Sequence, residues 1–206
     1  ATSGPAGESV DGAGGVRNAA EIEALYRART DSLRMRFTDA DVRFVTNMIH
    51  HHAQALEMAV LAPMRGASPA VQTLAARIIN AQQDEIATFQ RWLEDRGFTA
   101  PRVHIDGASV HVEGADHDAH MPGMLTNEQM TALRNTYGAE FDRFFLTLMI
   151  QHHNGAVRMV RDLFATDGAG QEEEVFRLAS DIQVDQITEI RRMELMLSTL
   201  PPAGGR

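Results

Sequence analysis

Two segments of the chain carry the residues best suited to chemistry, and each is a copy of the other. Residues 48–58 read MIHHHAQALEM and residues 149–159 read MIQHHNGAVRM, at a constant offset of 101 residues. Imidazole and thioether groups are both ligands for copper, and imidazole also suits zinc and iron. Adjacent histidines are costly to bury in an apolar helix unless each ring is hydrogen-bonded or bound to a metal. The repetition therefore predicts a metal site.

The helical periodicity of these segments predicts which side chains point inward. At about 100° per residue, His52 lies near the centre of an apolar stripe and His51 lies at its edge. His50 points to the opposite side, and because the second copy has a glutamine there, we expect His50 to be exposed and dispensable. In the second copy, His153 takes the central position and His152 the edge.

A second repeated motif completes the candidate site. Gln82-x-x-Glu85 returns as Gln186-x-x-Glu189, at an offset of 104 residues. These side chains fall in or beside apolar stripes, where an unpaired carboxylate is costly, so histidines and glutamates must satisfy one another or coordinate a cation. The candidate metal ligands are Met48, His51, His52, Met58, Gln82 and Glu85 in the first half, and Met149, His152, His153, Met159, Gln186 and Glu189 in the second.

Helices must position these motifs, because helical periodicity dominates the chain. We expect helices over about residues 18–37, 38–63, 69–97, 138–166 and 171–200, with a short helix opening at 126. Capping patterns begin at Thr38, Ser68 and Thr126. Each half is then a helical hairpin, with His-His on one helix and Gln-x-x-Glu on the other. Two such hairpins make a four-helix bundle.

The predicted fold class is all-α, with an extra N-terminal helix and an irregular central linker added to the duplicated hairpins. Residues 1–17 are polar and Gly-rich, which is typical of a disordered leader. The two repeats cover 18–97 and 126–200 and form one bundle domain, and 201–206 is a tail. In the linker, 98–125, alternating residues favour a small hairpin that sets His104 opposite His111.

Composition excludes several classes of function. The formal net charge is −9, which argues against nucleic acid as a partner and is compatible with attracting cations. The chain has no cysteine and no lysine, so thiol nucleophiles, cysteine zinc sites and Schiff-base chemistry are excluded. No apolar run approaches the roughly 18 residues of a membrane span. No nucleophile, base and acid constellation is recognisable, and we assign no catalytic residue.

In their order along the chain, these motifs resemble the bacterial family catalogued as domain of unknown function 305. The resemblance rests on Asp142-Arg143-Phe144-Phe145 with the second His-His segment, on Met121-Pro122-Gly123-Met124-Leu125, and on the matching motifs of the first half. It extends from about residue 39 to residue 197. It implies a ferritin-like bundle in an exported protein, located in the periplasm, at the cell surface or outside the cell. Some members are periplasmic copper binders that use His and Met. This chain lacks the Met-rich tails of the dedicated copper members, which weighs against high-capacity copper handling.

Loop residues before the second repeat are candidates for an auxiliary metal site. Met121 and Met124 match the family's methionine pair, and His117 and His120 precede them directly. A loop lacks the fixed geometry that helix faces give to ligands. We therefore expect these four side chains to supply an auxiliary site at most.

Three functions are compatible with these features. The leading hypothesis is an extracytoplasmic protein that binds a metal ion for sequestration or transfer. Copper, as Cu(I) or Cu(II), is the first choice, with zinc or iron as alternatives. The second hypothesis is a metal-free interaction bundle whose core histidines hydrogen-bond to Glu85 and Glu189. The third is a ferritin-like di-metal oxidase, although two inward glutamates are few for a di-iron centre. The sequence identifies no protein partner.

Overall fold

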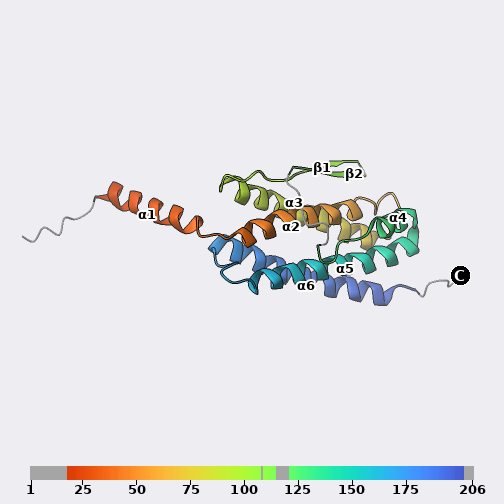
Figure 1. Cartoon of the computed structure of the whole chain (residues 1–206). Coiled ribbons are helices and arrows are strands. Elements are labelled where there is room, and N and C mark those ends of the chain that lie inside the picture. The colour runs from red at the N-terminus through yellow and green to blue at the C-terminus, as the bar shows by residue number, and fades with distance from the viewer. Residues whose placement is uncertain (1–17, 108, 115–120, 202–206) are drawn as a thin grey trace, which may run out of the picture. The chain divides into compact units, whose positions relative to one another are not determined.

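The computed structural model describes residues 18–107, 109–114 and 121–201, and Figure 1 shows its elements. The chain divides into two compact units, residues 1–35 and 36–206. The first unit contains the helix α1 (Ala19–Arg34). The second contains α2 (Asp39–Ala59), α3 (Pro69–Glu94), β1 (Arg102–Asp106), β2 (Ser109–Glu113), α4 (Asn127–Asn135), α5 (Gly138–Phe164) and α6 (Glu173–Thr199). The predicted leader, His117, His120 and most of the tail lie outside the described residues.

Four long helices form the bundle that the repeated motifs predict. α2 packs against α3, α5 packs against α6, and the two hairpins meet through α2 and α5. In Figure 1 the β hairpin lies along one flank of the bundle and α4 lies at one end. The predicted helical fold is confirmed, with a two-stranded sheet added to it. Within the described part of the chain, no helix combines the length and the apolar character needed to cross a membrane.

The helices begin where the local sequence predicts. The Thr38 hydroxyl accepts a hydrogen bond from the backbone N–H of Asp41, whose carboxylate accepts the backbone N–H of Thr38 at 2.7 Å. Ser68 caps α3, and Thr126 closes a second capping box. The predicted ends are less accurate. The helix expected to reach residue 63 stops at Ala59, because in a continued helix the ring of Pro63 would clash with the carbonyl of that residue.

Two buried aspartates at equivalent positions of the repeats fasten the hairpins to each other. Asp41 Oδ1 accepts the backbone N–H of Gly170 at 2.6 Å, in the turn between α5 and α6. Asp142 accepts the backbone N–H of Ser68 at 3.1 Å, at the start of α3. Each half therefore anchors the turn of the other half, as a pseudo-twofold arrangement requires.

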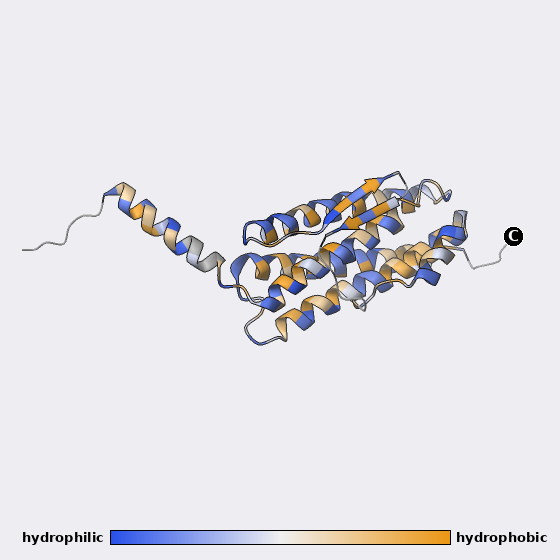
Figure 2. Ribbon diagram, turned by 45° about the horizontal axis from the view of Figure 1, so that its top comes forward, coloured by the Kyte–Doolittle hydropathy of each residue, from blue (hydrophilic) through white to orange (hydrophobic). Residues whose placement is uncertain are grey.

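The apolar core has two clusters, separated by polar residues. One cluster contains Met48 and Trp92, and the other contains Met58 and Phe141. Figure 2 shows apolar and polar residues on different sides of the bundle helices. On each long helix, the polar residues of the repeated motifs lie between a stretch that packs in one cluster and a stretch that packs in the other. Leu56 is an exception, because it packs in the first cluster although its apolar neighbours on α2 pack in the second. We call this set the polar layer: His51, His52, Gln82, Glu85, His152, His153, Gln186 and Glu189.

The linker folds into the hairpin that its alternating pattern predicts. β1 and β2 pair antiparallel, with His104 opposite His111. Val103 and Val110 face the bundle and pack against the first cluster, and β2 contacts α2. The hairpin therefore covers a part of α2 that the helical wheel alone leaves open to solvent.

Candidate metal centre

Four histidines meet where α2 packs against α5. His51, His52, His152 and His153 are all fully buried. The rings of His51 and His152 are closest, with centroids 3.8 Å apart and planes at 34°. Adjacent rings of the same helix are farther apart, at 6.4 Å in α2 and 6.3 Å in α5. His51 and His152, which the helical periodicity places at the edges of the apolar stripes, therefore lie at the centre of the layer. The reason is that the two hairpins contact each other along those edges.

The other two histidines each meet the glutamate of their own hairpin. Nε2 of His153 lies 2.7 Å from Oε2 of Glu189, with hydrogen-bond geometry. Nε2 of His52 also lies 2.7 Å from Oε2 of Glu85, within ion-pair distance. These two atoms are not aligned for a hydrogen bond, and both count as buried atoms without a hydrogen-bond partner. The repeated His and Gln-x-x-Glu motifs are thus in contact in both halves.

A loop segment covers the layer on one side. Nε2 of His51 donates to the carbonyl oxygen of Pro122 at 3.1 Å. The Gln54 amide accepts the backbone N–H of Leu125 at 2.7 Å and donates to its carbonyl at 3.1 Å. Met121 is buried in the first cluster, and Met124 packs against it. The premise that this loop lacks fixed geometry is therefore wrong for residues 121–125, because hydrogen bonds and packing anchor them.

Gly155 allows the segment to approach α5. A Cβ at this position would lie 2.1 Å from the Pro122 carbonyl oxygen and 2.5 Å from the Cα of Gly123. Gly123 itself has a φ of +79°, which favours glycine. The equivalent of Gly155 in the first repeat is Gln54, so the two copies hold the same loop in different ways, one through an amide and the other through a missing side chain.

Replacing Gly155 with alanine should push the segment at 121–125 away from α5 and break the hydrogen bond between His51 and Pro122. Overpacking of this kind lowers the free energy of unfolding by about 1–3 kcal/mol. Urea unfolding would measure the loss. The control is Asn154→Ala at an exposed position of the same turn, expected to stay within about 0.5 kcal/mol. Equal stability of the two variants would show that the segment moves aside without cost.

Burial keeps the central pair of histidines neutral. Burial, with His52 as the second cause, lowers the pKa of His51 to about 3. Burial, followed by the neighbouring His51, lowers the pKa of His152 well below its ordinary value. A neutral imidazole carries one N–H and one lone pair. Because Nε2 of His51 donates to a carbonyl, the lone pair of His51 lies on Nδ1.

Buried polar atoms without a hydrogen-bond partner collect in the polar layer. They include Nδ1 of all four histidines, Nε2 of His152, both amide atoms of Gln82 and Oε1 of Gln186. Each such atom costs about 1–3 kcal/mol, so the layer suits a cation or another polar ligand. Among the described residues, no three histidines or carboxylates are arranged to hold an ion as they stand. Coordination of a metal ion therefore requires these side chains to adopt other rotamers.

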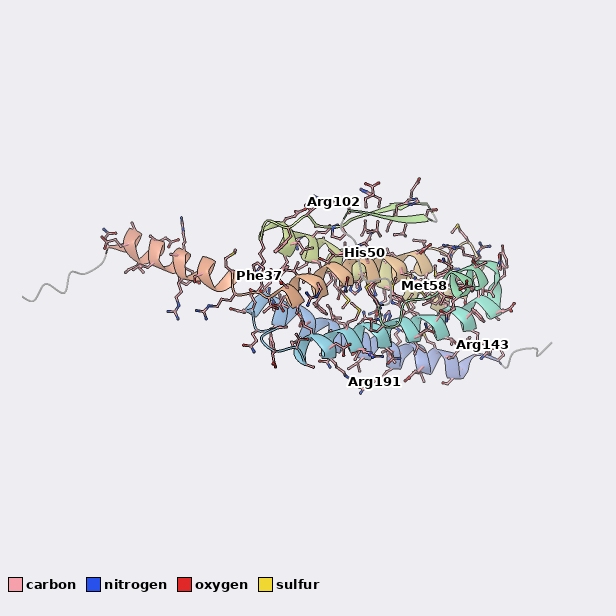
Figure 3. All side chains as sticks on the ribbon, in the orientation of Figure 1. Phe37, His50, Met58, Arg102, Arg143 and Arg191 are labelled. Atoms are coloured by element: carbon pink, nitrogen blue, oxygen red, sulfur yellow. The ribbon has the colours of Figure 1, made fainter. Side chains whose placement is uncertain are left out.

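The candidate methionines lie on both sides of the layer. Met48 and Met159 join Met121 in the first cluster, whereas Met58 and Met149 join the second. Met58 lies toward the α4 end of the bundle (Figure 3). The methionine that starts one repeated segment therefore shares a cluster with the methionine that ends the other. This pairing across the repeats is what antiparallel α2 and α5 produce.

His50 contradicts the helical wheel. Its side chain is buried, with 9% exposed, although the wheel predicts exposure. The reason is the hairpin, since β2 packs on α2 and covers the face opposite the bundle core. His50 lies on α2 beneath the hairpin in the view of Figure 3. Its equivalent Gln151 is exposed and bonds Gln129 instead. The expectation that His50 is exposed is wrong, and its dispensability loses its basis.

A cavity opens next to the segment that covers His51. It has a volume of about 230 Å³, and its lining includes Arg43, Met121, Pro122, Met159 and Asp162. Two thioethers, one carboxylate and the guanidinium of Arg43 therefore border the same space as Pro122.

Several contributors to the site were not identified from the sequence. They are the Pro122 carbonyl, the Gln54 amide, Gly155 and Asp185. The pKa of Asp185 is raised by burial and then by Glu85, so an additional acid stands near the carboxylates of the layer. The signal for Gly155 was present, because a glycine in the middle of a helix is unfavourable unless close packing requires it.

Comparisons with known proteins agree on the fold. The family described as Domain of unknown function (DUF305) matches residues 41–197. The structure of a DUF305 fragment from Deinococcus radiodurans has 32% identity and a TM-score of 0.66, and the alignment covers 80% of this chain and 99% of that one. A DUF305 protein from Streptomyces coelicolor, named as a candidate secreted protein, has 28% identity and a TM-score of 0.63, with 81% and 97% covered.

A copper-bound protein is also among the similar structures. CopM in its Cu(I)-bound form has 26% identity and a TM-score of 0.57, and the alignment covers 77% of this chain and 95% of CopM. CopM structures in Cu(II)-bound and Ag-bound forms match as well. Among curated proteins, none matches the chain.

Proposed function

The chain belongs to the DUF305 family, and we propose that it binds copper in the polar layer, for sequestration or transfer of the metal outside the cytoplasm. The ligands in this proposal are the four histidines, with Gln82, Glu85, Gln186 and Glu189 beside them. Met48, Met58, Met149 and Met159 contribute thioethers from the flanking clusters. Met121 and Met124 form the auxiliary site together with His117 and His120.

One observation carries the proposal: Nδ1 of every histidine in the layer is buried without a partner. In His51 and His153, the opposite nitrogen bonds a carbonyl or carboxylate oxygen. In His52, that nitrogen lies 2.7 Å from a carboxylate oxygen. Ligating histidines usually donate their second nitrogen to such an oxygen, which fixes the tautomer and leaves the other lone pair for the metal. His51 and His153 thus have the hydrogen-bond pattern typical of metal-bound histidines, and His52 has a carboxylate at the same position without the hydrogen bond.

The donor set favours copper over harder cations. Imidazole binds copper in both oxidation states, and thioethers prefer Cu(I). Because His51 and His152 stay neutral in the folded protein, protons compete with the metal only weakly at these rings. The cavity lined by Met121, Met159 and Asp162 gives an approach from solvent to the Pro122 segment.

Family membership supports both the metal and the location. CopM, solved with Cu(I), Cu(II) and Ag, shares the fold at 26–28% identity. The Streptomyces coelicolor relative is named as a candidate secreted protein. Export to the periplasm, the cell surface or the medium is therefore part of the proposal.

Copper titration of protein purified without a His-tag tests the function. We expect tight binding of Cu(I), and a rise in melting temperature that grows with free copper. At a free concentration of about 100 Kd, the bound metal should add about 2.7 kcal/mol to the free energy of unfolding. Zinc titrated in parallel measures selectivity. Folded protein with no copper binding and no change in melting temperature would overturn the proposal.

A specific observation favours a second candidate, the metal-free interaction bundle. His52 and His153 each contact a carboxylate, Glu85 and Glu189 respectively, at 2.7 Å. In this alternative, the pairs neutralise buried polar groups and the bundle serves as a binding scaffold. It predicts that copper leaves the melting temperature unchanged, so the same titration separates the two candidates.

A further inference from the structure

The β hairpin carries two histidines directly opposite each other. β1 and β2 are antiparallel, and the register pairs His104 with His111. Both side chains are exposed. In an antiparallel sheet, residues directly opposite on one face have Cβ atoms about 4.5–5.5 Å apart. That separation lets two imidazoles reach one ion from adjacent strands.

The hairpin is a fixed platform for this pair. Its alternate residues Val103, Val110 and Val112 are half-buried, and the first two pack against the first apolar cluster. Since successive side chains point to opposite faces of a strand, packing of the valines turns the histidines to solvent. The two rings are thus presented by paired strands that rest on the bundle, not by a loop.

The neighbouring side chains suit a cation as well. Asp106 and Glu113 lie on the same face as the histidines, two residues along the strand from His104 and from His111 respectively. Arg102, a positive charge on the same strand as His104, forms an ion pair with Glu94 at 2.7 Å. Two opposed imidazoles suit Cu(II) or Zn(II), and a carboxylate would join them as a ligand only after its side chain turns toward the pair.

We propose that His104 and His111 form a second metal site, on the surface of the hairpin, that takes a divalent cation of the Cu(II) or Zn(II) type. The site does not depend on the function proposed for the polar layer, because it shares no residue with it. Its nitrogen and oxygen donors contrast with the thioethers that flank the layer. The two sites therefore differ in the copper oxidation state that they favour.

The test uses Cu(II) and a variant with unchanged composition. Exchanging Arg102 with His104 and Ser109 with His111 (Arg102→His, His104→Arg, Ser109→His, His111→Ser) keeps both histidines on the exposed face. It moves them four residues apart along the strands, or about 13 Å. We expect the exchange to weaken Cu(II) binding at this site by at least about tenfold, because the second imidazole no longer binds within the same chelate.

Two further measurements make the outcome decisive. Electron paramagnetic resonance of wild-type protein should show a Cu(II) signal with two nitrogen ligands, and the exchange variant should lose it. His111→Ala alone should lose as much affinity as His104→Ala with His111→Ala, since one remaining imidazole cannot chelate. Both measurements are repeated in a protein with His51 and His152 replaced by leucine. Cu(II) bound at the polar layer then does not mask binding at the hairpin. Unchanged Cu(II) affinity and signal in the exchange variant would overturn the proposal.

Discussion

Replacing His51 and His152 together with leucine should weaken Cu(I) binding by about 100-fold or more while the protein stays folded. Loss of residues that merely orient a ligand already costs about 10–100-fold in metal affinity, and these two rings lie 3.8 Å apart at the centre of the layer. Leucine fills much of the same volume and removes three unpaired buried nitrogens, which offsets the loss of the hydrogen bond from His51 to the Pro122 carbonyl. We therefore expect an unchanged or higher melting temperature without metal. Competition with a Cu(I) chelator of known affinity measures the loss.

The matched control removes two histidines from the surface instead. His104→Ala with His111→Ala should leave Cu(I) affinity at the layer within about twofold, because substitutions at distant sites act independently. If the leucine variant kept wild-type Cu(I) affinity, the central pair would not be ligands, and His52 and His153 would become the remaining candidates. If it lost affinity together with its cooperative unfolding, the result would reflect structure, so the melting curve is recorded for each variant.

The repeated motifs were sufficient to predict the helical bundle and the residues of the layer. Spacing places a histidine or a glutamate at the same height on each helix, and capping at Thr38, Ser68 and Thr126 locates three helix starts. Residue spacing and helix capping depend on residues close together in the sequence, so both can be predicted from the sequence alone. The wheel did not identify the central pair, because it locates a stripe and not the neighbour that the stripe faces.

Contacts between residues that are distant in the sequence were not predictable. His50 is buried because the hairpin returns over α2, and His51 is held by the carbonyl of Pro122, which has no side-chain signal. Gln54 and Gly155 occupy equivalent positions in the two repeats and yet hold the same loop. The departures from symmetry between the repeats, rather than the symmetry itself, mark where this loop covers the site.

Burial also changes the expected competition between protons and copper. With an ordinary histidine pKa of about 6.5, copper affinity at the layer would fall between about pH 7 and pH 5. Burial lowers the pKa of His51 to about 3, so the folded protein does not protonate this ring in that interval. The effect of acid on His51 should therefore be seen in the stability of the fold before it is seen in direct competition with the metal.

Lowering the pH from about 7.5 to about 5 should destabilise the metal-free protein by about 2 kcal/mol through His51 alone. The unfolded chain binds a proton at this histidine below about pH 6.5, whereas the folded chain does so only near pH 3. The unfolded state thus holds more protons throughout that window, and stability falls as the pH falls. The lowered pKa of His152 acts in the same direction.

Asp185 opposes this trend in the acidic part of the range. Burial and Glu85 raise its pKa, so the folded state binds a proton there before the unfolded state does, which adds stability as the pH falls. Urea unfolding at several pH values measures the sum, and the leucine variant of His51 and His152 is the control. It should lose most of the pH dependence above about pH 5, because it lacks the two histidines whose pKa is lowered in the folded state. A wild-type protein that is equally or more stable at pH 5 would mean that the folded layer accepts protons. Paired imidazolium and glutamate groups would then describe the core better than neutral rings that hold their lone pairs for copper.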